Sequence, residues 1–151
     1  MDIQGINRTD AEKIFATYKN GEAYQLIPGT PVCVDFVTDS NGKTVKTPAT
    51  GNTAFFAGCV AGRTIGTSGQ PDQYGQIQVY GYHGGVRVNG LSAVAPGGML
   101  GILAGSSTLR LGVSGVSTTD FNLLAAHVIA GTTLAESADL DTTMIAFIRA
   151  L

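Results

Sequence analysis

Residues 55–66 read FFAGCVAGRTIG, residues 74–82 read YGQIQVYGY and residues 86–103 read VRVNGLSAVAPGGMLGIL, so short apolar runs alternate with glycines through this part of the chain. Apolar runs of this length between turn signals are typical of strands. Glycine permits the tight turns and close backbone approaches that such strands need. The pattern predicts a mainly β fold, a small glycine-rich barrel or sandwich, in a stretch that holds few reactive side chains.

The composition indicates one globular domain with an unusually neutral surface. The chain has 151 residues, of which 44% are hydrophobic and only 13% are charged. The charged share is about half of the usual quarter. Removing a neutral surface from water costs less free energy than removing a charged one. The composition therefore favours a protein that works through contacts with other proteins.

The charge pattern argues against two classes of partner. The net charge is −2 and the nine lysine and arginine residues are scattered singly along the chain, so no basic cluster is expected to neutralise a row of phosphates. No stretch reaches 18 apolar residues, and charged residues interrupt the first 13 positions. We therefore expect no direct nucleic-acid binding, no membrane span and no conventional secretion signal.

The first 24 residues differ from the rest. Ile14, Phe15 and Tyr18 have helical spacing, Thr9 or Asp10 suits an N-cap, and Asn20-Gly21 suits a helix end. This predicts an extended arm followed by a short helix over residues 11–19. The predicted organisation is therefore an arm and helix at 1–24 and a single β domain at 25–151.

Period-two alternation begins after Pro28-Gly29. It predicts a strand at 31–37, a turn at 39–42 and an edge strand or loop at 43–52. Residues 66–75 are rich in Gly, Ser, Pro and Asp, which predicts an exposed loop.

The second half of the chain is predicted as further strands. The strand at 75–82 is expected to reverse at His83-Gly84-Gly85 into a strand at 86–88. Residues 123–134 suit either a helix or a strand. Residues 142–151 alternate β-branched and aromatic residues, which favours a strand.

Two motifs that resemble functional sequences have simpler interpretations. Gly42-Lys43-Thr44 resembles the end of a phosphate-binding loop, but Val37 stands where that loop requires a glycine, so a turn is favoured. Cys33 and Cys59 lie in apolar strand-like runs, which favours two buried free thiols over a disulfide or a metal site.

The remaining titratable residues predict no catalytic, cofactor-binding or metal site. His83 lies in a glycine turn and is expected to face solvent, whereas His127 lies in an apolar run and is expected to be partly buried. Asp139 and Asp141 alternate as in some calcium loops but lack the remaining acidic ligands. Paired carboxylates for glycoside hydrolysis are conceivable, and all five candidates flank turns or loops: Asp35, Asp39, Asp72, Asp120 and Glu136.

The order of these elements resembles one family. FFAGCVAGRTI, a Gly/Pro loop, YGQIQVYGYHGGVRVNG and AVAPGGMLGIL occur in the order found in the tailed-bacteriophage capsid decoration (cement) proteins. The later AAHVIAGTTLAES and MIAFIRAL are similar to the terminal strands of that family, so the resemblance covers residues 25–151.

The resemblance implies a β-tulip-like fold and a non-enzymatic function. Such a protein, often a homotrimer, sits on the outer capsid surface of the virion and clamps neighbouring copies of the major capsid protein. It would be made in the host cytoplasm and need no cofactor.

The alternative is a carbohydrate-binding β-sandwich module of a phage tail or fibre. Its sugar-stacking platform would have to come from Tyr74, Tyr80 and Tyr82, because the chain has no tryptophan. A small hydrolase is a further alternative that would need a cluster of titratable groups in one cleft.

Overall fold

The computed structural model describes residues 13–89, 97–111, 124–130 and 141–150, without the side chains of residues 111, 124–130 and 141. These ranges are mainly β, with one short 3₁₀ helix, η1, at Thr53–Phe55. The strands are β1 Ile14–Asn20, β2 Pro31–Val34, β3 Thr44–Lys46, β4 Phe56–Val60, β5 Tyr74–Asn89, β6 Met99–Gly101, β7 Arg110–Leu111, β8 Leu124–Ala130 and β9 Asp141–Arg149.

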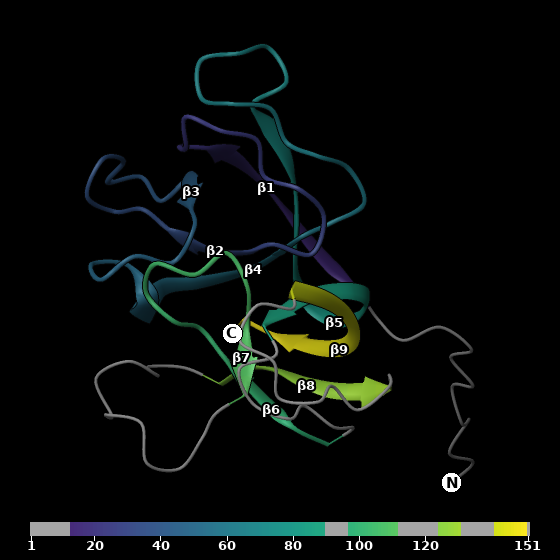
Figure 1. Cartoon of the computed structure of the whole chain (residues 1–151). Coiled ribbons are helices and arrows are strands. Elements are labelled where there is room, and N and C mark those ends of the chain that lie inside the picture. Colours follow the sequence, from purple (N-terminus) through teal and green to yellow (C-terminus); the bar gives the residue numbers. More distant parts are fainter. Residues whose placement is uncertain (1–12, 90–96, 112–123, 131–140, 151) are drawn as a thin grey trace, which may run out of the picture.

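Five strands close into a barrel. Their order is β1-β3-β2-β4-β5, and β5 pairs back with β1 to complete the circle (Figure 1). β1 and β3 run parallel, and the other neighbours in the barrel run antiparallel. Closure leaves these five strands without a free edge, which removes a common site of unwanted strand pairing.

The 16-residue strand β5 connects the barrel to a second group of strands. Its first half pairs with β1 and β4, and its second half pairs with β9. The sheet then continues through β8 and β6 to β7. Figure 1 shows this second group below the barrel strands β1 to β4. One bent strand therefore belongs to both parts of the molecule.

The expected reversal at His83-Gly84-Gly85 is wrong, because the strand continues through these residues. The register with β9 shifts between His83 and Val86, so the glycines form a bulge within β5. Their partner strand supplies Ala146 opposite His83 and Met144 opposite Val86. Because β9 pairs on both sides of the bulge, the chain continues as one strand where a local turn signal would reverse it.

The expected helix at 11–19 is also wrong over its described part. Residues 14–20 form β1, whose partners are residues 44–45 of β3 and 74–80 of β5. Ala16 and Tyr18 pack partly buried against the barrel core, and Asn20 is fully buried. Local spacing suited a helix, but pairing with two strands distant in sequence outweighs that preference. Residues 14–20 are thus part of the barrel wall. The expected arm ahead of the helix, and residues 11–12 of the helix itself, lie outside the described residues.

Other expectations are met in full or in part by the described strands. The strand expected at 31–37 forms only over 31–34, because the chain turns into a loop at Asp35. The expected turn at 39–42 closes when the Gly42 N–H donates to the Asp39 carbonyl at 3.0 Å, and the strand expected at 142–151 forms at 141–149. Residues 124–130, open between helix and strand in the sequence, form β8. The edge strand or loop expected at 43–52 is wrong for residues 44–46, which form the short strand β3 with partners on both sides. The described ranges contain no helix with the length and apolar character needed to cross a bilayer.

The barrel wall separates two apolar cores. The first fills the barrel and includes Val32, Val45, Val60 and Ile77. The second lies on the opposite face of β2 and β4; among its members are Cys33, Cys59, Val86, Leu100 and Ile148. Val32 and Cys33 are neighbours in β2 and enter different cores, as expected from the period of two. A strand buried on both faces explains why the sequence here is apolar without polar alternation.

One glycine is fixed by the approach of two strands. Gly58 in β4 has φ +130°, a conformation that L side chains rarely adopt. A Cβ atom there would lie 2.1 Å from the Gln78 carbonyl oxygen of β5. The glycine in FFAGCVAG therefore permits close contact between β4 and β5 and does not end the strand.

Candidate functional site

The loop after β2 is fixed by the buried carboxylate of Asp35. Oδ1 accepts the N–H groups of Val37 and Thr38 at 3.0 and 3.3 Å. Oδ2 accepts the Thr38 hydroxyl and lies 2.7 Å from Lys46 Nζ. The Lys46 ammonium and the Thr38 hydroxyl, followed by these backbone donors, lower the pKa of Asp35 to about 2. One side chain thus holds the residues 36–38 against β3.

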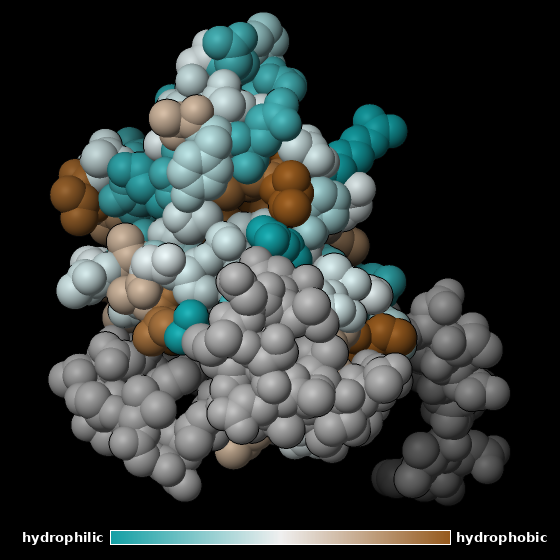
Figure 2. Space-filling model, viewed as in Figure 1, coloured by the Kyte–Doolittle hydropathy of each residue, from teal (hydrophilic) through white to brown (hydrophobic). Residues whose placement is uncertain are grey.

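This loop and the 3₁₀ helix η1 together present an apolar surface, which we call the aromatic patch and define as Phe36 and Val37 of the loop and Phe55 of η1. The rings of Phe36 and Phe55 meet edge to face with centroids 5.0 Å apart. Val37 is 84% exposed, and each phenylalanine is nearly half exposed. Figure 2 shows the apolar surface as separate small areas on a mostly polar face. Covering such exposed apolar side chains with a partner removes them from water and stabilises the complex.

A glycine allows the patch to form. Gly42 has φ +67°, and a Cβ atom there would lie 2.9 Å from the Phe36 ring. The turn Asp39-Ser40-Asn41-Gly42 therefore both reverses the chain and provides the surface on which Phe36 rests. Gly42-Lys43-Thr44 belongs to this turn and to the start of β3, as the sequence predicted.

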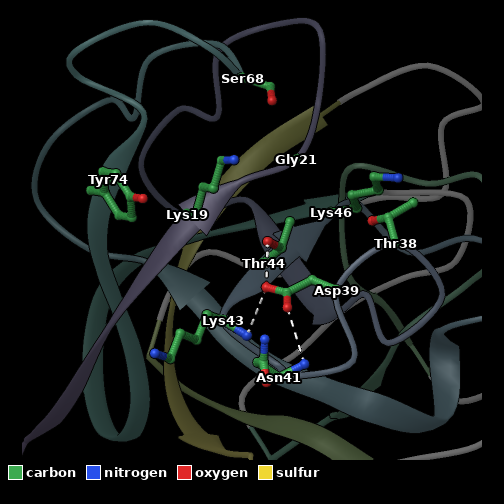
Figure 3. A pocket seen from close by; sticks show the side chains of 10 residues that line it. All are labelled: Lys19, Gly21, Thr38, Asp39, Asn41, Lys43, Thr44, Lys46, Ser68 and Tyr74. Carbon is green, nitrogen blue, oxygen red and sulfur yellow. Dashed lines mark hydrogen bonds between the residues drawn. The ribbon is translucent and has the colours of Figure 1, made fainter.

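Other residues of the same loop line a polar cleft (Figure 3). We call it the basic cleft, because three lysines line it: Lys19 from β1, Lys43 from the turn and Lys46 from β3. Its volume is about 480 Å³. The other lining residues are Gly21, Thr38, Asp39, Asn41, Thr44, Ser68 and Tyr74.

The cleft contains one carboxylate whose hydrogen bonds are made within the loop. Asp39 Oδ2 accepts the Thr44 hydroxyl at 2.8 Å and the Lys43 N–H at 3.2 Å, and Oδ1 accepts the Asn41 N–H at 3.0 Å. The Thr44 hydroxyl is the main cause of a lowered pKa at Asp39. Asp39 therefore stays ionised and acts as the internal acceptor of this turn.

The structure places His83 differently from the sequence prediction. The side chain is buried, not solvent-facing, because β5 continues past it and lies against β4. The Gly85 N–H donates to Nδ1 at 3.1 Å, and Nε2 lies 3.1 Å from the Val60 carbonyl oxygen. Since Nδ1 accepts, Nε2 carries the proton and donates to Val60. Burial lowers the pKa of His83, so the neutral ring holds the bulge in place.

The two cysteines are buried and free, as predicted. Burial raises the pKa of the Cys33 thiol to about 12 and raises that of Cys59 further from its ordinary value. Both thiols belong to the second core, where they pack as small apolar groups.

The other sequence candidates are not brought together. Asp72 is exposed in the loop before β5, whereas Asp35 and Asp39 lie in the loop after β2. No group of three or more potential metal ligands occurs within the ranges that the structure describes. The His127 and Asp141 side chains, and Asp120, Glu136 and Asp139 entirely, lie outside the described residues.

The three tyrosines do not share one environment. Tyr74 is 60% exposed and lines the basic cleft. Tyr80 is partly buried and packs edge to face on Phe147 with centroids 5.0 Å apart. Tyr82 is partly buried as well. Only Tyr74 therefore presents most of its ring to solvent, as a stacking platform for sugars would require.

Sequence reasoning missed the basic cleft and the aromatic patch. Lys19, Lys43 and Lys46 are separated by up to 27 positions (46 − 19), so they give no basic cluster in the sequence. The sequence Asp35-Phe36-Val37 could have indicated the aromatic patch, because two apolar residues there follow a strand and come just before a turn.

The chain was compared with protein-family models, with curated proteins and with solved structures, and none of them matches it.

Proposed function

We propose that this chain is a non-enzymatic structural protein that binds the outside of a phage capsid and stabilises the shell by clamping neighbouring major capsid subunits. In this proposal the chain works as a homotrimer and follows the β-tulip-like plan of the capsid decoration proteins. The sequence resemblance over residues 25–151 and the mainly β architecture support the proposal.

The observation that carries the proposal is the aromatic patch on a rigid support. Phe36 and Phe55 contact each other while each stays nearly half exposed, and the Asp35 carboxylate fixes the backbone at Val37 and Thr38. A patch that is already ordered loses little conformational entropy when a partner covers it. Covering a fully exposed side chain of this size contributes about 1.5–3 kcal/mol, and partial exposure gives a part of that. A shell with many equivalent sites needs only modest affinity at each one.

The sequence suggests that residues 1–24 supply part of the shell contact; since residues 14–20 are β1 of the barrel, we propose that the part before β1 adds a second contact. The test is a deletion that ends before Lys13, because a longer deletion removes β1 and opens the barrel. Weaker binding of the truncated protein to bare capsids supports this contact, and unchanged occupancy of the capsids contradicts it.

The function itself is tested by rebinding to particles. Capsids of a tailed phage that encodes the chain are stripped of it, mixed with purified protein and sedimented. We expect the wild-type chain to return to the pellet at a fixed ratio to the major capsid protein. Absence of the chain from intact particles, or no rebinding at saturating concentration, contradicts the proposal.

Two matched variants test the role of the patch in the same assay. The double change Phe36→Ser and Val37→Ser removes apolar area and is expected to weaken rebinding by about tenfold or more. Met99→Ser removes an exposed apolar side chain of β6 and serves as the control. If the double variant and Met99→Ser rebind equally well, the shell contact does not involve the aromatic patch. A glycan array on the wild-type protein tests the carbohydrate alternative.

A further inference from the structure

Three strands bring the basic cleft together at one place on the barrel surface. In the register of the sheet, Lys19 of β1 lies opposite Tyr74 of β5 on one side and Thr44 of β3 on the other. The Lys19 N–H donates to the Lys43 carbonyl at 2.9 Å, so the two lysines are held by neighbouring backbone. Figure 3 shows Lys19 and Thr44 between Tyr74 and Lys46, with Asp39 and Lys43 of the turn next to Thr44.

The charges in the cleft do not cancel. The Lys46 ammonium is paired with Asp35 at 2.7 Å. Asp39 faces Lys43 and accepts three hydrogen bonds from its own turn. Within the described part of the chain, neither Lys19 nor Lys43 has a carboxylate within ion-pair distance, so the cleft carries net positive charge. A partly enclosed surface with one sign of charge attracts the opposite charge from solution.

The packing keeps one lysine stem against the cleft wall. A Cβ atom on Gly21 would lie 3.0 Å from Lys46 Cε and 2.7 Å from Thr44 Cγ2. The absence of a side chain at position 21 therefore leaves room for the Lys46 stem. Neutral hydrogen-bonding groups complete the lining at Thr38, Asn41 and Ser68. A volume of about 480 Å³ is within the range of ligand-binding clefts.

The cleft and the aromatic patch share one loop. Residues 36 and 37 of this loop belong to the patch, and residues 38, 39, 41 and 43 line the cleft. A ligand that covers both must place acidic groups within a few residues of apolar side chains. An extended protein segment meets this requirement, since it presents side chains of different character in succession. A nucleic acid fits less well, because a phosphate backbone needs a longer row of cations than this cleft provides.

We infer that the basic cleft binds the carboxylate side chains of an acidic, partly apolar segment of a partner protein, with Lys19 and Lys43 as the cationic contacts. The inference rests on the proposed function only for the source of that segment, which would be the capsid subunit. The binding chemistry itself is a property of the isolated chain.

The test is a nuclear magnetic resonance titration of the full-length ¹⁵N-labelled protein with two capped peptides. One peptide contains two glutamates flanked by leucines, and the other has glutamines in place of the glutamates. We expect the acidic peptide to shift the amide signals of Lys19, Lys43 and Ser68, with an affinity that falls as salt is added. The glutamine peptide is expected to bind at least about tenfold more weakly.

Two variants decide whether the cleft is responsible. Lys19→Gln combined with Lys43→Gln is expected to lower the affinity for the acidic peptide by about tenfold or more. Lys13→Gln removes a lysine that does not line the cleft and is expected to leave the affinity unchanged. An unchanged amide spectrum of the double variant outside the cleft shows that it is folded.

Three results would overturn the inference: no shifts at the cleft, equal binding of the two peptides, or equal affinity in the double variant. Tighter binding of inorganic phosphate, a short oligonucleotide or a neutral oligosaccharide than of the acidic peptide would also overturn it. The titration and the particle assay are separate measurements. If the acidic peptide does not bind but the protein rebinds to particles normally, only the cleft inference is wrong. If the peptide binds at the cleft but the protein does not rebind to particles, only the capsid proposal is wrong.

Discussion

The Lys46 ammonium nitrogen lies 2.7 Å from the carboxylate of Asp35, and this ion pair joins the loop after β2 to the last residue of β3. The same carboxylate accepts hydrogen bonds from the N–H groups of Val37, which belongs to the aromatic patch, and of the adjacent Thr38. Barrel stability and the shape of the proposed contact surface therefore depend on one side chain.

Replacing Asp35 by asparagine is expected to lower the free energy of unfolding by about 1–3 kcal/mol. The amide oxygen can still accept the Val37 N–H, but the charge that pairs with Lys46 is lost. Urea denaturation measures the change. Asp72→Asn, at an exposed loop carboxylate, is the control and is expected to have little effect. Equal stability of the two variants would show that the Asp35 contacts contribute nothing net.

The pH dependence of this variant provides an independent check. The pKa of Asp35 is lowered to about 2 in the folded chain, below its ordinary value of 3.8. The folded state therefore binds fewer protons in this interval, so the contribution of Asp35 is present above pH 4 and is lost as the pH falls towards 2. The stability difference between wild type and Asp35→Asn should shrink over that interval. A difference that is constant from pH 5 to pH 2 contradicts the assignment.

The buried His83 predicts a second pH effect at milder acidity. Burial lowers its pKa below 6.5, with Lys13 as a further cause and the hydrogen bond to Val60 opposing them. The unfolded chain binds the proton more readily, so stability is complete above pH 6.5 and decreases as the pH falls through the folded-state value. Thermal unfolding followed from pH 8 to 5 measures this decrease, and His83→Gln is expected to reduce it. A His83 ring signal that titrates at or above pH 6.5 in the folded protein would refute the prediction.

The two thiols are expected to be inert in the folded protein. Cys33 and Cys59 are fully buried and their pKa values are raised, so neither forms the reactive thiolate at neutral pH. A chromogenic disulfide reagent at pH 8 should modify neither cysteine in the native chain and both in urea. Rapid modification of either thiol in the native state contradicts the described core.

Gly58 should be far less tolerant of substitution than a glycine in an open turn. Gly58→Ala combines a positive φ with a contact of 2.1 Å to the Gln78 carbonyl, and is expected to cost at least about 2 kcal/mol. Gly51→Ala is the matched control, because a Cβ atom there meets nothing within 4 Å. Comparable urea midpoints for the two variants would mean that β4 and β5 are not so closely packed.

Much of the strand content could be predicted from the sequence. Residues 31–34 and 141–149 have the β-branched and aromatic alternation of strands, and the turn at 39–42 carries its own signal in Asp-Ser-Asn-Gly. The buried state of Cys33 and Cys59 also follows from their apolar neighbours. In each case the information is local, within about ten residues.

The errors arose where distant partners decide the conformation. Ile14, Phe15 and Tyr18 fit a helix locally, yet residues 14–20 pair with β3 and β5. His83-Gly84-Gly85 reads as a turn, yet β9 pairs on both sides of it and makes it a bulge. The basic cleft was missed for the same reason, because its three lysines meet only when the barrel closes.

The most direct test of the proposed function is a cryo-electron microscopy map of the phage particle that carries this chain. We predict trimeric density on the outer surface of the shell, at the meeting point of major capsid subunits, with Phe36, Val37 and Phe55 turned towards the shell. Density that is absent from the outer surface, or that turns this patch to solvent, would contradict the proposal.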